Sequence, residues 1–193
     1  MERLDFVHLH LHSEYSLSDG IIRINELVSR ASSLEYSAVG LTDLTNLFGL
    51  LEFYRSSREN GIKPIVGAEV NVIKDKDSLS APIVLLVKDK TGYINLTKIV
   101  SKAYVDGQVN GQPMVELSML QDYSEGLIAL SGGMEGHIGQ SILSGNIALT
   151  ESRIEFFKNI FGEDFFLEVH RLGKANEEEY NKTAVDIATK MDV

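Results

Sequence analysis

Three of the five histidines stand at two-residue spacing near the start of the chain, at His8, His10 and His12. Side chains alternate between the two faces of a β-strand, so a strand over residues 5–12 places the three imidazoles on one face and the intervening aliphatic side chains on the other. Imidazole nitrogens bind zinc, manganese and iron, and two histidines on one strand face can hold a single ion. With Asp19 close behind, the spacing favours a metal or phosphate site at the strand end. The alternative is a row of histidines that forms only the polar face of an edge strand.

The segments that must position these side chains alternate in pattern between strand and helix. Short apolar runs predict strands, and apolar residues at three- and four-residue spacing predict helices. The predicted strands cover residues 5–12, 38–41, 63–73, 82–87, 127–130 and 165–170, and the predicted helices lie at about 24–34, 50–60, 96–104, 118–122, 138–143, 149–161 and 177–191. Such alternation is typical of parallel strands joined by crossover helices, so the sequence predicts an α/β fold, either barrel-like or an open sheet.

Polar residues follow the carboxyl ends of several predicted strands. In parallel α/β folds these ends meet at one edge, where functional sites lie. We therefore expect the side chains to come together although they are far apart in the sequence. They are His12, Asp43, Glu69, Ser131 and His170. The candidates to line the resulting cleft are His8, Asp43, His170 and Arg171.

The composition fits one soluble globular domain: of 193 residues, 44% are hydrophobic and 24% are charged. No run of about 18 apolar residues is present, which excludes a membrane-spanning helix. The lack of cysteine excludes disulfides and cysteine-ligated zinc, and it fits the cytoplasm. The net charge of −10 argues against a main nucleic-acid-binding surface, because neutralising phosphates needs Lys and Arg. It is compatible with metal-assisted phosphoester chemistry, in which cations supply the positive charge.

Several stretches carry a family resemblance. The segment from His8 to Ser13, followed by Ser16 and Asp19-Gly20, resembles the opening motif of the PHP (polymerase and histidinol phosphatase) family. More narrowly, the chain is similar to the N-terminal PHP domain of bacterial DNA polymerase III α subunits in the runs TDLTNL at 42–47, GIKPIVGAE at 61–69, TGYINL at 91–96, LSGG at 130–133 and NIAL at 146–149. The resemblance covers nearly the whole chain in order. It implies a distorted (β/α)7 barrel and a cytoplasmic replication protein.

The resemblance also implies that residues 1–193 are a truncated PHP domain, incomplete at its C-terminus. The family pattern continues past Val193 into a strand with an Asp-x-His pair. The polymerase domains, with their magnesium and their DNA-binding surfaces, are then absent from this chain.

The same resemblance implies a metal site that has lost part of its ligand set. The matched ligand positions are His10, His12, Asp19 and Glu69. The departures are Leu44, where the pattern has His, the stretch at Pro82-Ile83, where another His is missing, and Gly133, where many members have Cys. A site without its full set of ligands loses affinity steeply. We expect a vestigial site that can hold one zinc or manganese ion weakly, and no residue of this chain is assigned as catalytic.

Three functions remain open from the sequence. The first, implied by the resemblance, is a structural PHP domain of the DNA polymerase III α subunit that docks the proofreading exonuclease subunit and other holoenzyme subunits, reaches DNA only through the absent domains, and has no membrane partner. The second is an active metal-dependent 3′–5′ exonuclease or other phosphoesterase site. The third is a free-standing PHP phosphatase, against which the polymerase-like runs argue. The enzyme activity of the parent protein would be that of a DNA-directed DNA polymerase, a nucleotidyltransferase.

Overall fold

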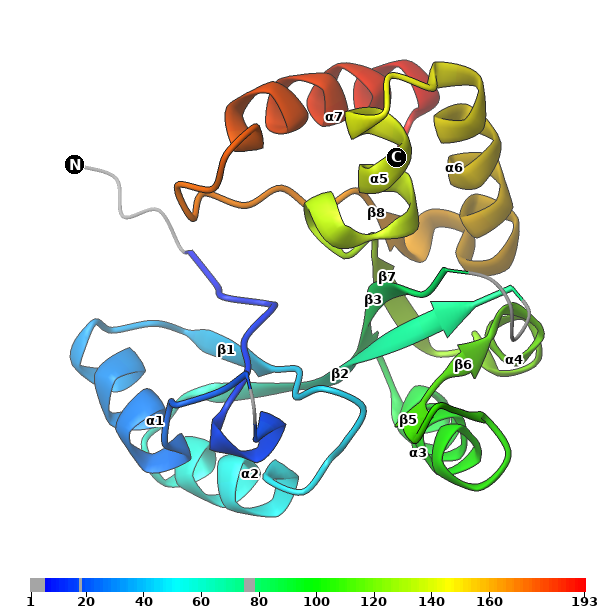
Figure 1. Cartoon of the computed structure of the whole chain (residues 1–193). Coiled ribbons are helices and arrows are strands. Elements are labelled where there is room, and N and C mark those ends of the chain that lie inside the picture. Colours follow the sequence, from blue (N-terminus) through cyan, green and yellow to red (C-terminus); the bar gives the residue numbers. More distant parts are fainter. Residues whose placement is uncertain (1–5, 18, 75–78) are drawn as a thin grey trace. The chain divides into compact units, whose positions relative to one another are not determined.

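A computed structural model describes residues 6–17, 19–74 and 79–193 of the chain, which Figure 1 colours along the sequence. By its internal contacts the chain divides into two units, Met1–Glu69 and Val70–Val193. We describe each unit by itself.

The first unit forms around one apolar cluster. Its elements are the 3-10 helix η1 (Glu14–Ser16), α1 (Ile24–Ser33), β1 (Ala38–Leu41), α2 (Leu50–Glu59) and the first part of β2 (Lys63–Ile73). Ile24, Val28 and Ala31 recur at helical spacing along α1, and all three are buried. They pack with side chains of β1 and with Phe53 of α2. The two helices therefore lie against each other, as Figure 1 shows.

Strand β1 is buried along its whole length and pairs in parallel with the start of β2. Ala38 stands opposite Lys63, and Leu41 opposite Val66. Parallel neighbours need a crossover of a dozen or more residues, which α2 provides. The carboxyl end of β1 thus leads into the loop that begins at Thr42, and the same edge of β2 carries Glu69.

The second unit contains most of the strands. They are the last part of β2, β3 (Ala81–Val87), β4 (Gln108–Val109), β5 (Gln112–Pro113), β6 (Val115–Glu116), β7 (Leu127–Leu130) and β8 (Phe165–Phe166). The order is β2-β3-β7-β8, with β6 also paired to β2, while β4 and β5 form a separate hairpin. The pairs β2–β6 and β7–β8 are parallel, whereas β3 and β7 are antiparallel.

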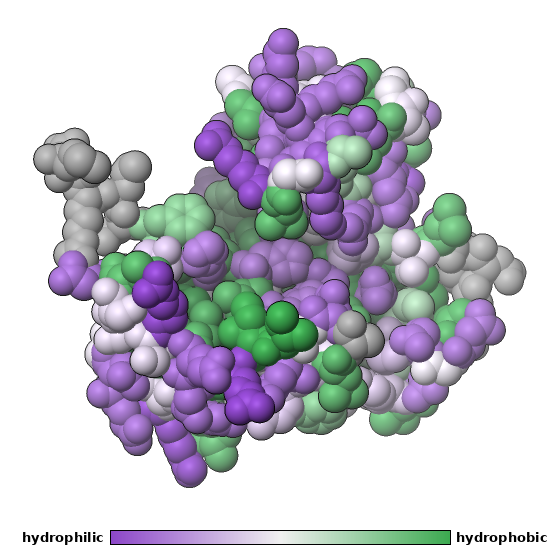
Figure 2. All heavy atoms as spheres, turned by 60° about the vertical axis from the view of Figure 1, so that its left-hand side comes forward, coloured by the Kyte–Doolittle hydropathy of each residue, from purple (hydrophilic) through white to green (hydrophobic). Residues whose placement is uncertain are grey.

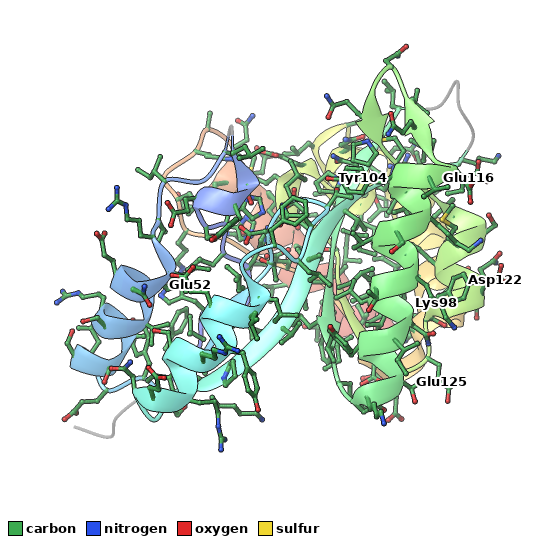
Figure 3. The ribbon with its side chains drawn as sticks, turned by 90° about the horizontal axis from the view of Figure 1, so that it is seen from below. Glu52, Lys98, Tyr104, Glu116, Asp122 and Glu125 are labelled. Atoms are coloured by element: carbon green, nitrogen blue, oxygen red, sulfur yellow. The ribbon has the colours of Figure 1, made fainter. Side chains whose placement is uncertain are left out.

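Helices cover the strands of the second unit. They are α3 (Lys90–Val105), α4 (Leu117–Tyr123), η2 (Gly133–Glu135), α5 (His137–Leu143), α6 (Ile147–Phe161), η3 (Gly162–Asp164) and α7 (Glu177–Met191). Asp89 begins α3 by accepting the Gly92 N–H at 2.9 Å, and Asn146 begins α6 in the same way. Lys98 on α3, labelled in Figure 3, links this helix to α4. Its Nζ lies over the ring of Tyr123 on α4, 5.3 Å from the ring centre.

The α/β fold is confirmed, but the predicted barrel is not closed. Among the residues that the structure describes, β1 and β8 are each paired with one other strand of the sheet and not with each other, so the strands do not complete a ring. The expected parallel pairing is found in β1–β2, β2–β6 and β7–β8, whereas β3 and β7 run antiparallel. Apolar patterning locates a strand but carries no information on its direction, which depends on tertiary packing. No helix in the described ranges is long and apolar enough to cross a membrane.

Candidate metal centre

The segment that carries the histidines runs beside β1. The Gly40 N–H donates to the carbonyl of His8 at 2.7 Å, and the Thr42 N–H donates to the carbonyl of Leu11 at 2.9 Å. A Cβ at residue 40 would stand 2.7 Å from the Leu9 carbonyl oxygen, so only glycine allows this approach. The predicted strand over 5–12 is nevertheless not a regular strand in its described part, residues 6–12. One of its backbone hydrogen bonds is formed with a side chain instead of a neighbouring strand, because the Leu11 N–H donates to Thr42 Oγ1 at 2.8 Å.

The three histidines separate into a pair and a single ring. His10 and His12 lie with their ring centres 5.4 Å apart. His8, which is exposed, instead contacts the rings of Phe6 and Tyr36, at 4.8 and 5.7 Å between centres. The structure thus brings together the two histidines of the family motif and places His8 among aromatic rings.

Glu69 completes a group of three possible ligands. The His10 ring donates its Nε2–H to Glu69 Oε2 at 2.7 Å, and His12 Nε2 lies 3.6 Å from the same oxygen. One ligand atom from each of the three residues lies within 4.8 Å of the others. The backbone of Glu69 is held by the following loop, because its carbonyl accepts the Thr45 N–H at 2.7 Å and its N–H donates to the Thr42 carbonyl at 3.2 Å.

Asp19 meets the outer side of His12. Its Oδ2 accepts a hydrogen bond from His12 Nδ1 at 2.6 Å, and its side chain is 60% exposed against 14% for that of His12. Of the four predicted ligands, three converge on one point and Asp19 binds the far nitrogen of one of them. Such a carboxylate fixes which ring nitrogen carries the proton and leaves the other nitrogen available for a metal.

The donor set suits a small divalent cation. Two imidazole nitrogens and one carboxylate oxygen are ligands that zinc and manganese accept. His12 Nε2 is buried, and it has no hydrogen-bond partner among the described residues. An orphaned buried nitrogen that faces a carboxylate is what a metal ligand looks like without its metal. A metal ion bound here would replace the proton between His10 and Glu69. The affinity of the site for the ion should therefore rise with pH.

Leu44 adds no donor to this group. It pairs with Glu69 through a single parallel bridge, and its N–H donates to Ser16 Oγ at 3.0 Å. Both interactions involve the backbone of Leu44, whose aliphatic side chain offers no ligand atom. The three-residue group is the largest that the described part of the first unit offers.

Asp43 proves to be a buried anchor. It is 2% exposed, and its carboxylate accepts hydrogen bonds from Ser13 and Ser16. The sequence reasoning ranked it with the residues that line a cleft and gave the two serines no role. The signal was present in the sequence, since both serines lie between the histidine pair and Asp19, but their shared partner is about 30 residues away.

His170 and Arg171 belong to the second unit. His170 Nε2 lies 2.7 Å from Glu168 Oε1, and Arg171 is exposed. The His170 ring fills the space beside Gly133: a Cβ at residue 133 would stand 2.8 Å from His170 Cε1. Glu168, missed in the sequence, is 8% exposed at its side chain, and its N–H donates to Ser131 Oγ at 2.9 Å.

Tyr180 of α7 contacts the backbone of Glu168. Its hydroxyl donates to the Glu168 carbonyl at 2.7 Å, and the residue is 1% exposed. Burial raises the pKa of Tyr180 to about 12, with the nearby Glu168 charge adding to the shift. The phenol therefore acts as a hydrogen-bond donor at any physiological pH.

Comparison with known proteins places the chain. Residues 8–172 match the PHP domain family. The chain is 40% identical over 190 residues to the DNA polymerase III subunit alpha of Vibrio cholerae, covering 97% of this chain and 16% of that protein. It is 43% identical over 185 residues to the same subunit of Escherichia coli K12, covering 95% and 16%. The chain thus spans about 16% of the length of these curated relatives.

A solved structure has a similar fold. It is that of a Bifidobacterium adolescentis protein assigned as a metal-dependent phosphoesterase, with a TM-score of 0.60 and 15% sequence identity. The match covers 97% of this chain and 84% of that one. At this identity the likeness concerns the fold alone, and it agrees with the α/β architecture described above.

Proposed function

This chain belongs to the PHP domain family, and we propose that it is the N-terminal PHP region of a bacterial DNA polymerase III α subunit, with a structural role and a reduced metal site. The resemblance inferred from the sequence motifs is confirmed by the family match and by identities of 36–43% to α subunits of proteobacteria. Polymerase activity, that of a nucleotidyltransferase, would lie in the remaining length of such a protein, together with magnesium and DNA binding. As a replication protein it would act in the cytoplasm.

The observation that carries the structural role is the size of the donor set. His10, His12 and Glu69 can hold one divalent cation, while Leu44, whose backbone forms a bridge with Glu69, has an aliphatic side chain and adds no ligand. A bound ion would supply a Lewis acid and an acidified water. Phosphoester hydrolysis with two metals needs a second ion about 4 Å away, for which the first unit offers no further cluster of ligands in its described part. We therefore propose a single weak site that supports the fold.

Docking of the proofreading exonuclease subunit is the second half of the proposal. Support comes from large apolar side chains that the first unit exposes: Leu17 at 83%, Ile21 at 94%, Phe48 at 69% and Leu51 at 60%. Figure 2, in which the left-hand side of Figure 1 comes forward, shows apolar side chains among polar ones on the face that it presents. Exposed apolar side chains that gather in one region are typical of protein-binding surfaces.

Metal content and nuclease activity test the first half. The whole chain, dialysed against zinc or manganese, is expected to retain at most one ion and to show no exonuclease activity. His12→Ala should abolish the binding, because it removes one of three ligands. Tight binding of two or three ions, with nuclease activity that His12→Ala eliminates, would contradict the structural role.

Capture of the exonuclease subunit tests the second half. In the full-length protein that contains this chain, Phe48→Asp with Leu51→Asp should weaken the capture by placing charges in the apolar region. Val105→Asp is the matched control, because Val105 is 80% exposed on α3 of the second unit. Equal capture by all three proteins would rule out this surface.

A metal-dependent phosphoesterase is the second candidate function. The buried, unpartnered Nε2 of His12 favours it, since a retained ligand geometry is what an active site requires. The metal titration above separates the two candidates. One weakly bound ion without hydrolysis supports the structural role, and stoichiometric tight binding with hydrolysis supports the phosphoesterase.

A further inference from the structure

Asp43 is a buried carboxylate that has no cationic partner in the described part of the chain. Its Oδ1 accepts hydrogen bonds from the Ser13 N–H at 2.6 Å and the Ser16 hydroxyl at 2.7 Å, and its Oδ2 accepts one from the Ser13 hydroxyl at 2.8 Å. No Lys or Arg pairs with it among the residues that the structure describes. A buried carboxylate is tolerated only when hydrogen bonds replace its hydration, so these donors are bound firmly.

The two serines delimit a turn that connects two members of the candidate metal centre. His12 directly precedes Ser13, which is the N-cap of η1. At the other end of the turn, the Ser16 carbonyl accepts the Asp19 N–H at 3.3 Å. The contact between His12 Nδ1 and Asp19 Oδ2, at 2.6 Å, therefore joins the two ends of a turn that Asp43 holds through Ser13 and Ser16.

We propose that Asp43 is a positioning residue for the His12 imidazole. By fixing the turn from Ser13 to Ser16, its carboxylate brings Asp19 onto His12 Nδ1. The proton then stays on Nδ1, and the lone pair of Nε2 points towards Glu69 Oε2, 3.6 Å away. The orientation of the ring follows from the fold alone, while its consequence for metal affinity rests on the function proposed above.

The contact network explains why the position needs an acid. Three donors converge on Asp43: one N–H and two hydroxyls. The Ser16 hydroxyl, once it donates to Asp43, accepts the Leu44 N–H at 3.0 Å, and the Ser13 hydroxyl likewise accepts the Tyr15 N–H at 3.2 Å. The carboxylate thus orients both hydroxyl groups. A neutral side chain with a single acceptor oxygen would leave one hydroxyl without its acceptor.

The test measures the ring of His12 directly. In the whole chain, labelled with nitrogen-15 on histidine and held at one fixed pH, the ring shifts report which nitrogen carries the proton. Asp43→Ala should convert His12 from the Nδ1–H form to a mixture of tautomers, and Asp43→Asn, which keeps one carbonyl oxygen, should restore part of the parent pattern. Zinc titration of the same samples should show affinity lower by about tenfold or more in Asp43→Ala.

Glu177→Ala is the matched control. Glu177 is also a buried carboxylate that accepts backbone hydrogen bonds, from the Leu172 and Gly173 N–H groups at 2.7 and 2.8 Å, but it lies in the second unit. It should alter neither the His12 shifts nor the zinc affinity. An effect of Asp43 through stability alone would make both alanine variants behave alike.

Every outcome decides the proposal. An unchanged His12 tautomer in Asp43→Ala overturns it. If that variant does not fold, Ser16→Ala removes a single donor and should shift the tautomer in the same direction by a smaller amount, and no shift there overturns the proposal equally. If the parent chain binds no zinc, the proposed metal site fails, while the tautomer measurement still decides the role of Asp43.

Discussion

Thr45 combines two unfavourable features at one position, and removing them should stabilise the chain. Its φ of 49° is in the left-handed region, which costs an L-residue about 1–2 kcal/mol and suits a β-branched residue least. The residue is 1% exposed, and its buried Oγ1 has no hydrogen-bond partner among the described residues, at a typical cost of about 1–3 kcal/mol. Thr45→Gly relieves both.

The substitution also has costs. The greater chain entropy that glycine loses on folding costs about 0.5–1 kcal/mol. Loss of the buried threonine methyl group costs about 0.8 kcal/mol of hydrophobic stabilisation. Relief of about 3 kcal/mol against costs of about 1.5 kcal/mol leaves a gain in the free energy of unfolding of about 1.5 kcal/mol. The Thr45 N–H bond to the Glu69 carbonyl involves only the backbone, so Thr45→Gly should preserve it.

Urea unfolding of the parent chain and the variants measures this difference. Thr45→Val keeps the β-branch and removes the hydroxyl, so it should recover only the part that belongs to the unpartnered oxygen. Asn110→Gly is the control, because Asn110 has a φ of 52° but is exposed, and asparagine tolerates this region. Its effect should stay within about 0.5 kcal/mol. A loss of stability of about 1 kcal/mol or more in Thr45→Gly would refute the reasoning.

Two further predictions concern the second unit. Burial lowers the pKa of His137, with the hydrogen bond to the Val72 carbonyl opposing and the Arg153 charge adding, so the unfolded chain binds the proton more tightly. The free energy of unfolding should therefore fall as the pH drops below about 6.5. Denaturant titrations at several pH values should show a smaller decline in His137→Gln than in the parent chain. An equal decline in both proteins would contradict the prediction. Gly92→Ala would place a Cβ 1.8 Å from the Gly126 carbonyl oxygen, so thermal unfolding should show a loss of about 2 kcal/mol or more, and an unchanged midpoint would contradict the close approach.

Elements with strong periodicity could be located from the sequence, whereas irregular hydrogen bonding could not. Strand β2 and helix α7 lie at the predicted residues 63–73 and 177–191, because each carries an unbroken apolar pattern. The predicted strand over 165–170 shortens to β8. Beyond Phe166 the backbone bonds to a side chain, since the Glu168 N–H donates to Ser131 Oγ, and a local apolar pattern cannot reveal such a partner.

In the candidate metal centre, too, some features could be predicted from the sequence and others could not. The spacing of His10 and His12 was enough to place their rings together, because two-residue spacing acts locally. The polar positions predicted at strand ends include Glu69, which the structure places beside both rings. The hydrogen bonds of Asp43 to Ser13 and Ser16 could not be predicted, since a carboxylate after a strand resembles a site residue whichever way it points. Only the tertiary fold shows that it turns inward to Ser13.

The loop around Leu44 suggests how a ligand can be lost without loss of the fold. The residues on either side of it carry the unusual features: Asp43 is a buried carboxylate, and Thr45 has a positive φ and holds the Glu69 carbonyl. Leu44 itself contributes its backbone, through its N–H bond to Ser16. Because the path of the loop depends on its neighbours and on backbone groups, the side chain at residue 44 is free to vary. Leucine at this position is therefore compatible with the arrangement of Glu69, His10 and His12 that the structure shows.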